Sequence, residues 1–401
     1  MRIMRWVGLL SLFAGGLLSS CSETDSSLEP GTTSADSCHR TVLVYMLGSN
    51  SLSSYIETNI SAMKKAVEEG ALHYGNLLLY IDRYNAQPTL EQLSLHDGEV
   101  ERTVIQTYEN DNSATVEVMS AVCADMEELY PADSYGLILW SHANGWYPKT
   151  DQVVTRSFGD DDGEEMDIDE VASALPDSLF DFILCDACYM GAVEVAYEWR
   201  KDCRYYIASP ATIMGVGFPY EEMLPHLFSC DSPIPENLVE VCKDYMDFYR
   251  SYDEPYGTIS LTDTRELEAL SRAMHLVLAG AVDSVSVASL QQYSQERSSA
   301  VSYQNLFFDL DDFVQSVAAD SSAYAAFADC LSRAVLYADA TEEYPSQVYT
   351  RWLTFPIEHY SGLSVYVPGA AGNTRIDDYY RTLSWYGQVY EDIDEIPLKS
   401  E

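Results

Sequence analysis

A histidine and a cysteine stand just after two apolar segments, where a hydrolase could use them. His142 follows the run YGLILW (residues 135–140), and Cys188 follows the run FDFILC (residues 180–185). Runs of this length and composition are typical of buried parallel strands. Open α/β folds place their sites at the carboxyl ends of such strands. The pattern therefore predicts Cys188 as the nucleophile and His142 as the base of a cysteine hydrolase.

The segment after Cys188 bears on its reactivity. Residues 190–199 have a helical pattern, so Cys188 is expected where a strand turns towards a helix N-terminus. The partial positive charge of such a terminus lowers the pKa of a thiol. Because the thiolate is the attacking species, this position would favour nucleophilic attack.

Strands and helices alternate along the chain in a way that predicts an α/β fold. The pattern predicts strands at residues 41–47, 76–82 and 204–209, a hairpin at 90–105, and helices around 56–67, 113–130 and 167–175. Strands separated by helices of this length argue for a parallel sheet covered on both faces. Two later strands, at residues 257–261 and 363–367, either extend this sheet or form their own layer.

The N-terminal residues predict export. Basic residues precede an apolar run, residues 6–18, that is too short to span a bilayer comfortably, so residues 1–20 are expected to be a signal peptide. The end of this stretch, Leu18-Ser19-Ser20-Cys21, resembles the lipobox of bacterial lipoproteins, which implies lipidation of Cys21. The alternative is an ordinary signal peptide with a structural cysteine nearby.

Residues 21–40 are expected to be a disordered tether, because small and polar residues dominate them and cannot bury enough apolar surface to fold. Together with the lipid, this tether predicts a protein of the bacterial cell envelope, either periplasmic or surface-exposed. No later segment has about eighteen uninterrupted apolar residues, so membrane contact is expected through the N-terminal lipid only.

The charge of the chain limits its partners. The sequence has 22 basic and 64 acidic side chains and a formal net charge of −42. Nucleic acid is therefore excluded as a partner, since its binding depends on neutralising phosphates with Lys and Arg. Solubility is sufficient to explain this charge, and attraction of cationic substrates or of calcium is compatible with it.

The cysteines offer a second interpretation of the same site. Cys185 and Cys188 form a C-x-x-C pattern, which would suit a thiol-redox protein or a zinc ligand pair. A zinc site needs a second pair of ligands at similar spacing, and the sequence has none, so no metal site is predicted. Cys123, on the apolar stripe of a predicted helix, and Cys185, at the end of a buried strand, are expected to be reduced core residues.

The two motifs carry a family resemblance. Ser141-His142-Ala143-Asn144-Gly145-Trp146 and Asp186-Ala187-Cys188-Tyr189-Met190-Gly191 resemble the motifs of the clostripain-like cysteine peptidases, relatives of caspases, gingipains and legumains. The segments TVLVYMLGSNSL (41–52), FFDLDDF (307–313) and GLSVYVP (362–368) extend the likeness. The resemblance implies a caspase-like α/β/α sandwich with a mostly parallel central sheet at residues 41–250, followed by a smaller C-terminal α/β region at 251–401.

The resemblance also implies an activity, cleavage of proteins or peptides after arginine or lysine without a required cofactor. Cys188 would form an acyl-enzyme while His142 transfers protons, and the backbone N–H groups of Cys188 and Ala143 would hold the oxyanion. The chain departs from the family at Ala143, where relatives usually have glycine, so the oxyanion hole needs an ordinary φ angle at this residue. Tyr189 replaces a more usual leucine.

Asp186 occupies the family position at the base of the pocket for the basic residue of the substrate. A carboxylate there would pair with arginine or lysine. The alternative is that its side chain caps the following helix. The segment from Ser209 to Tyr220, which should supply the rest of the pocket, lacks the acidic residues often seen in relatives.

The polar linker between His142 and Cys188 contains two basic residues. Several relatives are activated by self-cleavage in this interval, so the bonds after Lys149 and Arg156 are candidates, and an uncut surface loop is the alternative. The acidic residues from Asp160 to Asp169 do not fit the EF-hand pattern. Calcium dependence of some relatives leaves a calcium site open, although acidic runs are usually only solvated.

A third interpretation follows from the departures at Ala143 and in the pocket segment. They would suit a lipoprotein of the cell envelope that keeps a caspase-like fold as a binding or scaffold protein without turnover. Loss of activity on replacing Cys188 distinguishes the peptidase from this scaffold.

Overall fold

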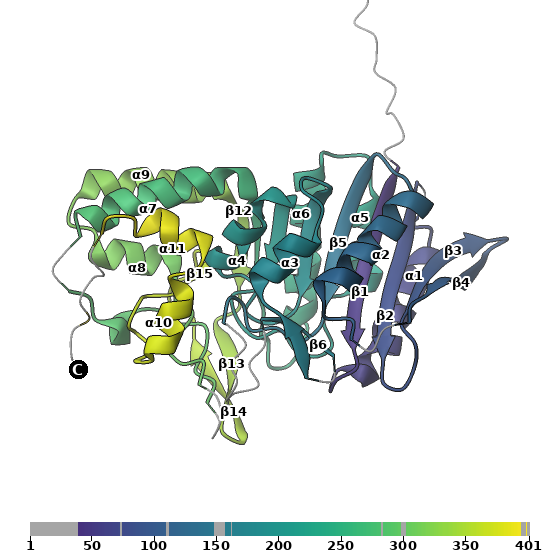
Figure 1. Cartoon of the computed structure of the whole chain (residues 1–401), viewed down its shortest axis with the longest axis horizontal. Helices are drawn as coiled ribbons and strands as arrows, with labels where there is room; N and C mark the ends of the chain where they lie inside the picture. Colours follow the sequence, from purple (N-terminus) through teal and green to yellow (C-terminus); the bar gives the residue numbers. More distant parts are fainter. Residues whose placement is uncertain are drawn as a thin grey trace, which may run out of the picture. The chain divides into compact units, whose positions relative to one another are not determined.

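The apolar runs pair into one nine-stranded sheet (Figure 1). The computed structural model describes residues 39–72, 74–109, 112–147, 157–161, 163–281, 284–297, 302–393 and 398, so the predicted signal peptide and most of the predicted tether lie outside the described residues. The strand order is β12-β10-β9-β8-β5-β1-β2-β3-β4. The bounds are β1 (Arg40–Gly48), β2 (Gly75–Arg83), β3 (Thr89–His96), β4 (Glu99–Thr107), β5 (Ser134–Trp140), β8 (Phe180–Asp186), β9 (Cys203–Ala208), β10 (Thr258–Asp263) and β12 (Val335–Ala340).

The centre of the sheet is parallel and its edges are antiparallel. Strands β2, β1, β5, β8 and β9 pair in parallel. The hairpin β3–β4 is antiparallel on one edge and β10 and β12 are antiparallel on the other. Every residue of β1 is buried, as expected for a central strand covered on both faces. The prediction of a mostly parallel central sheet is confirmed.

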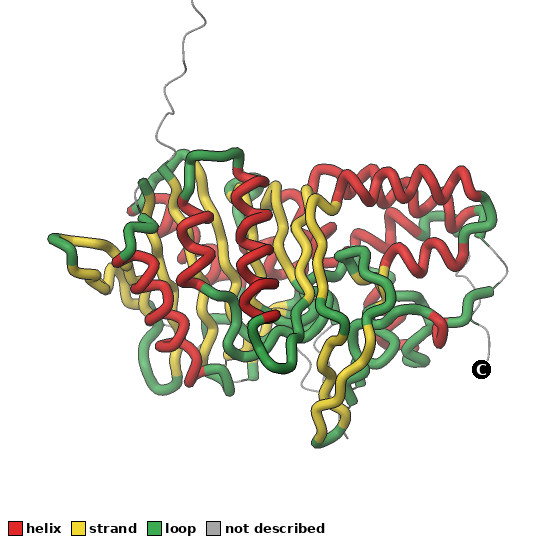
Figure 2. Tube along the Cα trace, turned by 180° about the vertical axis from the view of Figure 1, so that it is seen from behind, coloured by secondary structure: helices red, strands yellow, loops and turns green. Residues whose placement is uncertain are grey.

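Helices cover both faces of the sheet, as the two opposite views show (Figures 1 and 2). The alternate residues Val42, Val44 and Met46 of β1 join one core cluster, and Leu43, Tyr45 and Leu47 join the other. The first cluster includes α1 (Ile56–Glu68), α5 (Tyr220–Phe228) and α6 (Ile234–Arg250), and the second includes α2 (Val116–Leu129), α3 (Ile168–Ala174) and α4 (Val193–Glu198). The α/β/α sandwich predicted from the family resemblance is confirmed.

The region after residue 250 contributes to the main sheet and also builds smaller elements. Its two predicted late strands differ, because β10 joins the sheet beside β9, whereas the second becomes β15 and pairs outside it with β11. The remaining elements are α7 (Leu267–Ala279), α8 (Leu310–Val317), α9 (Ser321–Ala334), α10 (Thr374–Tyr380), α11 (Ser384–Val389), β11 (Phe308–Asp309), β13 (Glu343–Val348), β14 (Arg351–Pro356) and β15 (Ser364–Val365). Between β5 and α3 lies a short hairpin, β6 (Phe158–Asp161) and β7 (Glu164–Met166), and the 3₁₀ turns are η1 (Ser53–Tyr55), η2 (Trp199–Lys201), η3 (Thr264–Glu266) and η4 (Val287–Ser289).

The cysteines behave mostly as small core residues. Cys123 and Cys185 are buried and free, which confirms their prediction as reduced core residues. Cys188 is also free and partly exposed, so it forms no disulfide with Cys185. Cys230 is disulfide-bonded. Within the described part of the chain, no helix has both the length and the apolar character needed to cross a bilayer.

Candidate active site

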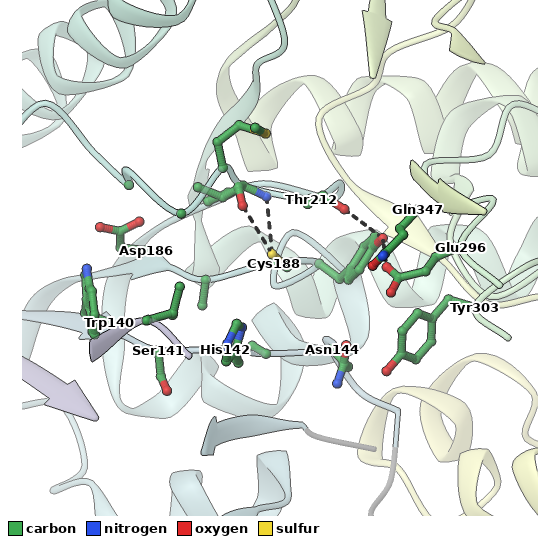
Figure 3. Close-up of a pocket in the computed structure, with 18 of the residues that line it drawn as sticks. Trp140, Ser141, His142, Asn144, Asp186, Cys188, Thr212, Glu296, Tyr303 and Gln347 are labelled. Carbon is green, nitrogen blue, oxygen red and sulfur yellow. Dashed lines mark hydrogen bonds between the residues drawn. The ribbon is translucent and has the colours of Figure 1, made fainter. Parts of the chain in front are cut away.

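The ends of β5 and β8 bring His142 and Cys188 into one pocket (Figure 3). The two strands are parallel neighbours, and Trp140 is paired with Asp186 at their carboxyl ends. His142 and Cys188 each follow two residues beyond this pair, so the register places them at the same edge of the sheet. They line a pocket of about 370 Å³ together with Ala143 and Asp186. The structure therefore brings together the four described residues predicted for the site.

His142 is held from a loop that the sequence did not single out. Its Nε2 atom lies 2.7 Å from the hydroxyl oxygen of Ser51, which follows β1. On the backbone, the carbonyl of His142 accepts a hydrogen bond of 3.0 Å from the N–H of Gly159 in β6. Ser51 belongs to the segment TVLVYMLGSNSL, which resembles the family. This resemblance is the only sequence feature that could have pointed to Ser51 as a neighbour of the site.

Cys188 lies in the turn between β8 and α4 and is tied to the segment after β9. Its sulfur accepts a hydrogen bond of 3.3 Å from the N–H of Ile213, and its thiol lies 3.5 Å from the carbonyl oxygen of the same residue (Figure 3). The next residue, Tyr189, donates its N–H to Ala211 at 3.0 Å and adopts a φ angle of 60°. These contacts fix the turn that presents the sulfur to the pocket.

The predicted lowering of the Cys188 pKa is wrong. Burial, with smaller contributions from the charges of Glu296 and Asp186, raises the pKa of this thiol to about 12, against the hydrogen bond from Ile213. The expected helix contributes little because α4 begins only at Val193 and has just six residues. The thiol is therefore protonated at neutral pH when no substrate is bound.

The backbone at Ala143 is compatible with an oxyanion hole, although relatives usually have glycine at this position. Ala143 is not one of the described non-glycine residues that have a positive φ angle. Its N–H can therefore point to an oxyanion without backbone strain. Ala143 forms an antiparallel bridge with Phe158 through the hydrogen bonds Asn144 N–H to Ser157 O and Gly159 N–H to His142 O. Neither bond uses the N–H of Ala143 itself, because the bridge is of the type in which the flanking groups bond.

Asp186 forms a buried wall of the pocket. Its Oδ2 atom accepts hydrogen bonds from the hydroxyl of Tyr220 at 2.9 Å and from the N–H of Phe218 at 3.2 Å, and Oδ1 takes part in neither bond. Burial raises the pKa of this carboxyl to about 6. Asp186 does not cap α4, whose N-cap is Ala192. The carboxylate is thus held by the segment that the resemblance assigns to the same pocket.

Gly217 allows this segment to approach Asp186. Its φ angle is +73°, and a Cβ atom built on it would lie 2.5 Å from Oδ2 of Asp186. A side chain would therefore suffer both backbone strain and a clash with the carboxylate. The glycine kept in the pocket segment has a direct physical role.

A second wall of the pocket comes from the C-terminal region, and sequence reasoning missed it. Its residues are Glu296, Tyr303, Gln347 and Trp352. Gln347 and Trp352 belong to the hairpin β13–β14, whose other exposed apolar residues include Tyr349 and Leu353. These side chains come from loops and a short hairpin without a clear periodicity, so the sequence carried no pattern that could have placed them near Cys188.

The acidic run after His142 is largely used within the fold. Asp160 accepts a hydrogen bond from the N–H of Gly163, and Asp161 accepts one from the N–H of Ser113. Asp167 forms a capping box at the start of α3. Among the described residues, no group of three His, Cys, Asp or Glu side chains is arranged to hold a metal ion. Lys149, Arg156 and Cys21 lie outside the described residues.

Comparison with known proteins points to one family. A family model described as the clostripain family matches residues 44–396. Among curated proteins, clostripain of Hathewaya histolytica is 29% identical over 148 residues, which are 33% of this chain and 28% of that protein. The match thus spans less than a third of the curated relative.

Solved structures are similar over most of the chain. The inactive zymogen of a C11 protease from Parabacteroides distasonis is 34% identical, with a TM-score of 0.77, over 88% of this chain and 98% of that one. A secreted C11 cysteine protease from Bacteroides thetaiotaomicron, solved with an irreversible peptide inhibitor, is 31% identical, with a TM-score of 0.77, over 88% of this chain and 99% of that one.

Proposed function

The chain belongs to the clostripain family of cysteine peptidases, and we propose that Cys188 and His142 carry its peptide-bond hydrolysis. The observation that carries this proposal is their position, since parallel neighbouring strands deliver both side chains to one pocket. A nucleophile and a base that converge from two buried strands are what acyl transfer requires.

The state of the thiol defines what His142 has to do. Because burial raises the pKa of Cys188 to about 12, the sulfur needs a base to take its proton as it attacks the substrate carbonyl carbon. His142 takes that proton and gives it to the departing amine, which leaves Cys188 as a thioester. A water molecule then attacks the thioester, passes a proton to His142 and releases the acid, and the proton returns to the sulfur.

The negative charge on the carbonyl oxygen needs donors during both steps. We assign them to the backbone N–H groups of Cys188 and Ala143, which come from the two strand ends. The ordinary φ angle of Ala143 supports this assignment, since alanine can adopt it as readily as glycine. Loss of one such donor typically slows the reaction about a hundredfold to a thousandfold.

Asp186 supports a preference for arginine or lysine before the cleaved bond. Its carboxylate lies on the pocket wall a short distance along the chain from Cys188, and its position is fixed by Phe218 and Tyr220. A fixed carboxylate forms charge-assisted hydrogen bonds with a cationic side chain. An apolar side chain in the same pocket would leave the buried carboxylate without a cationic partner.

Maturation and location complete the proposal. The same preference for basic residues would let the peptidase cleave its own linker after Lys149 or Arg156. Lipidation of Cys21 would hold the peptidase in the bacterial cell envelope, where it meets protein or peptide substrates.

The test is cleavage of peptides by the full chain and by its Cys188→Ala variant. Peptides carry arginine, lysine, leucine or glutamate before the bond and are otherwise identical. We expect the wild type to cleave the first two and the variant to cleave none, because the thioester cannot form. Activity that survives in Cys188→Ala contradicts the proposed mechanism, and equal cleavage of all four peptides contradicts the role of Asp186.

A further inference from the structure

The residue after the nucleophile anchors a carboxylate in the pocket. The hydroxyl of Tyr189 donates a hydrogen bond of 3.1 Å to Oε2 of Glu296. The same hydroxyl accepts hydrogen bonds from Thr212 at 2.8 Å and Ser294 at 3.1 Å. With both acceptor positions used, its proton is directed at Glu296. A leucine at position 189 could make none of these bonds.

The aromatic ring of Tyr189 is fixed as firmly as its hydroxyl. The ring is 1% exposed and stacks on Phe307, with centroids 4.8 Å apart and an interplanar angle of 8°. Glu296 is also held on its backbone, where its carbonyl accepts the N–H of Tyr303 at 2.9 Å. The carboxylate is therefore presented by a rigid support and not by a mobile side chain alone.

Glu296 faces the pocket without a cation of its own. Among the residues that the structure describes, no lysine or arginine forms an ion pair with Glu296, although it lines the same pocket as Cys188. Burial raises the pKa of this carboxyl against the hydrogen bond from Tyr189, because a charge in a partly buried place is costly without a cation beside it. A cationic group that enters the pocket would remove this cost.

The two carboxylates lie on opposite sides of the nucleophile. Figure 3 shows Asp186 on one side of Cys188, and Glu296 on the other side with Gln347 and Tyr303. When the scissile carbonyl of an extended peptide lies at the sulfur, the residues before the cleaved bond and those after it run away from the sulfur in opposite directions. If Asp186 receives the side chain before the cleaved bond, as proposed above, the side of Glu296 receives the leaving part.

We infer that Glu296, positioned by Tyr189, binds a lysine or arginine side chain in the first two residues after the cleaved bond. The preferred substrates are then peptides with basic residues on both sides of that bond. This inference rests on the proposed function, because it assigns a recognition element to the same catalytic pocket. Glu296 acts on binding of the leaving part, whereas Tyr189 is a positioning residue that acts through it.

The test compares three peptides that share arginine before the bond and carry lysine, alanine or glutamate in the two positions after it. For the wild type we expect kcat/KM to be about tenfold higher for the lysine peptide than for the alanine peptide, and lower still for glutamate. Glu296→Gln should bring the ratio of kcat/KM between the lysine and alanine peptides close to one. Tyr189→Phe keeps the stacked ring but loses the hydroxyl. It should lower the ratio of kcat/KM between the lysine and alanine peptides about threefold.

Matched controls separate recognition from general damage. Glu358→Gln removes the same charge from an exposed position outside the pocket and should preserve the preference. The inference is overturned if Glu296→Gln slows all three peptides equally, or if it changes selectivity only for residues placed before the bond. Loss of all cleavage in Cys188→Ala, seen alongside, shows that the proposed function holds even where the inference fails.

A binding measurement tests the same inference without cleavage of the peptide. The affinity of the lysine and alanine peptides is measured by calorimetry on Cys188→Ala, with and without Glu296→Gln. We expect the lysine peptide to bind about tenfold more tightly, and only when Glu296 is present. Equal affinities of the two peptides for Cys188→Ala would overturn the inference.

Discussion

The two walls of the active-site pocket are built in different ways. One wall, the strand-end wall, consists of His142, Ala143, Asp186 and Cys188 at the ends of β5 and β8, strands whose residues are almost all buried in the centre of the sheet. The other consists of Glu296, Tyr303, Gln347 and Trp352 from loops and a hairpin of the C-terminal region. The residues proposed for the chemistry thus lie at the ends of buried strands, and the opposite wall, the C-terminal wall, comes from loops and a hairpin at the surface.

The two walls also differ in how much of their side chains is exposed to solvent. Cys185 and Asp186, at the end of β8, are 0% and 5% exposed, whereas Trp352 on β14 is 57% exposed. Few neighbours constrain an exposed hairpin, so it can be changed without loss of stability. We therefore expect changes on the strand-end wall to affect catalysis strongly and changes on the C-terminal wall to affect which peptides are preferred.

The largest effect is expected for the base on the strand-end wall. His142→Ala should lower kcat by about a thousandfold or more, because a positioned acid/base supplies about 10²- to 10⁴-fold and the thiol of Cys188 stays protonated without it. The check is kcat for an arginine peptide, with His96→Ala, on an exposed hairpin, as the control. A loss below tenfold would show that another group takes the thiol proton.

A smaller effect is expected for Asp186, and it depends on pH. Asp186→Asn keeps the acceptor for Phe218 and Tyr220 but removes the charge, so kcat/KM for arginine peptides should fall about a hundredfold. Because the pKa of Asp186 is raised to about 6, the wild type should prefer arginine above this pH and lose the preference as the pH falls below it.

The pH series uses the ratio of kcat/KM for an arginine peptide to that for a leucine peptide, which cancels the titration of other groups. The ratio should rise through about pH 6 in the wild type and stay flat in Asp186→Asn. A ratio that titrates equally in both proteins would remove Asp186 from substrate recognition.

The smallest effect is expected on the C-terminal wall. Trp352→Ala should raise KM by a few-fold and leave kcat and thermal stability unchanged, since an exposed residue contributes mainly contact area. Leu353→Ala, on the neighbouring position outside the pocket, is the matched control. A loss in kcat comparable to that of His142→Ala would abolish the distinction between the two walls.

The strand-end wall could be predicted from the sequence because its signals are local. Buried parallel strands leave uninterrupted apolar runs, and His142 and Cys188 stand immediately after two of them. The pairing of β5 with β8 follows from the rule that consecutive parallel strands of such folds lie close together. The hairpin predicted at residues 90–105 is formed by β3 and β4, and Asp97 and Gly98 in its turn adopt the positive φ angles of a tight hairpin.

The rest depends on contacts that no local pattern encodes. Glu296 reaches Tyr189 across more than a hundred residues of chain. The pKa of Cys188 was misjudged for the same reason, because nearby sequence suggested a helix terminus, whereas burial and two carboxylates decide the outcome. The place of β10 between β9 and β12 was open in the sequence, because the residues of a buried strand do not specify which strands pair with it.

The proposed mechanism makes Cys188 the nucleophile of a pocket that accepts basic side chains. The most direct measurement is covalent capture by a peptide with arginine next to a thiol-reactive group, followed by peptide mapping of the labelled full chain. We expect one adduct, at Cys188, that is absent from Cys188→Ala and forms more slowly in Asp186→Asn and His142→Ala. Labelling of another cysteine at the same rate, or an undiminished adduct in Cys188→Ala, would contradict the proposed role of Cys188.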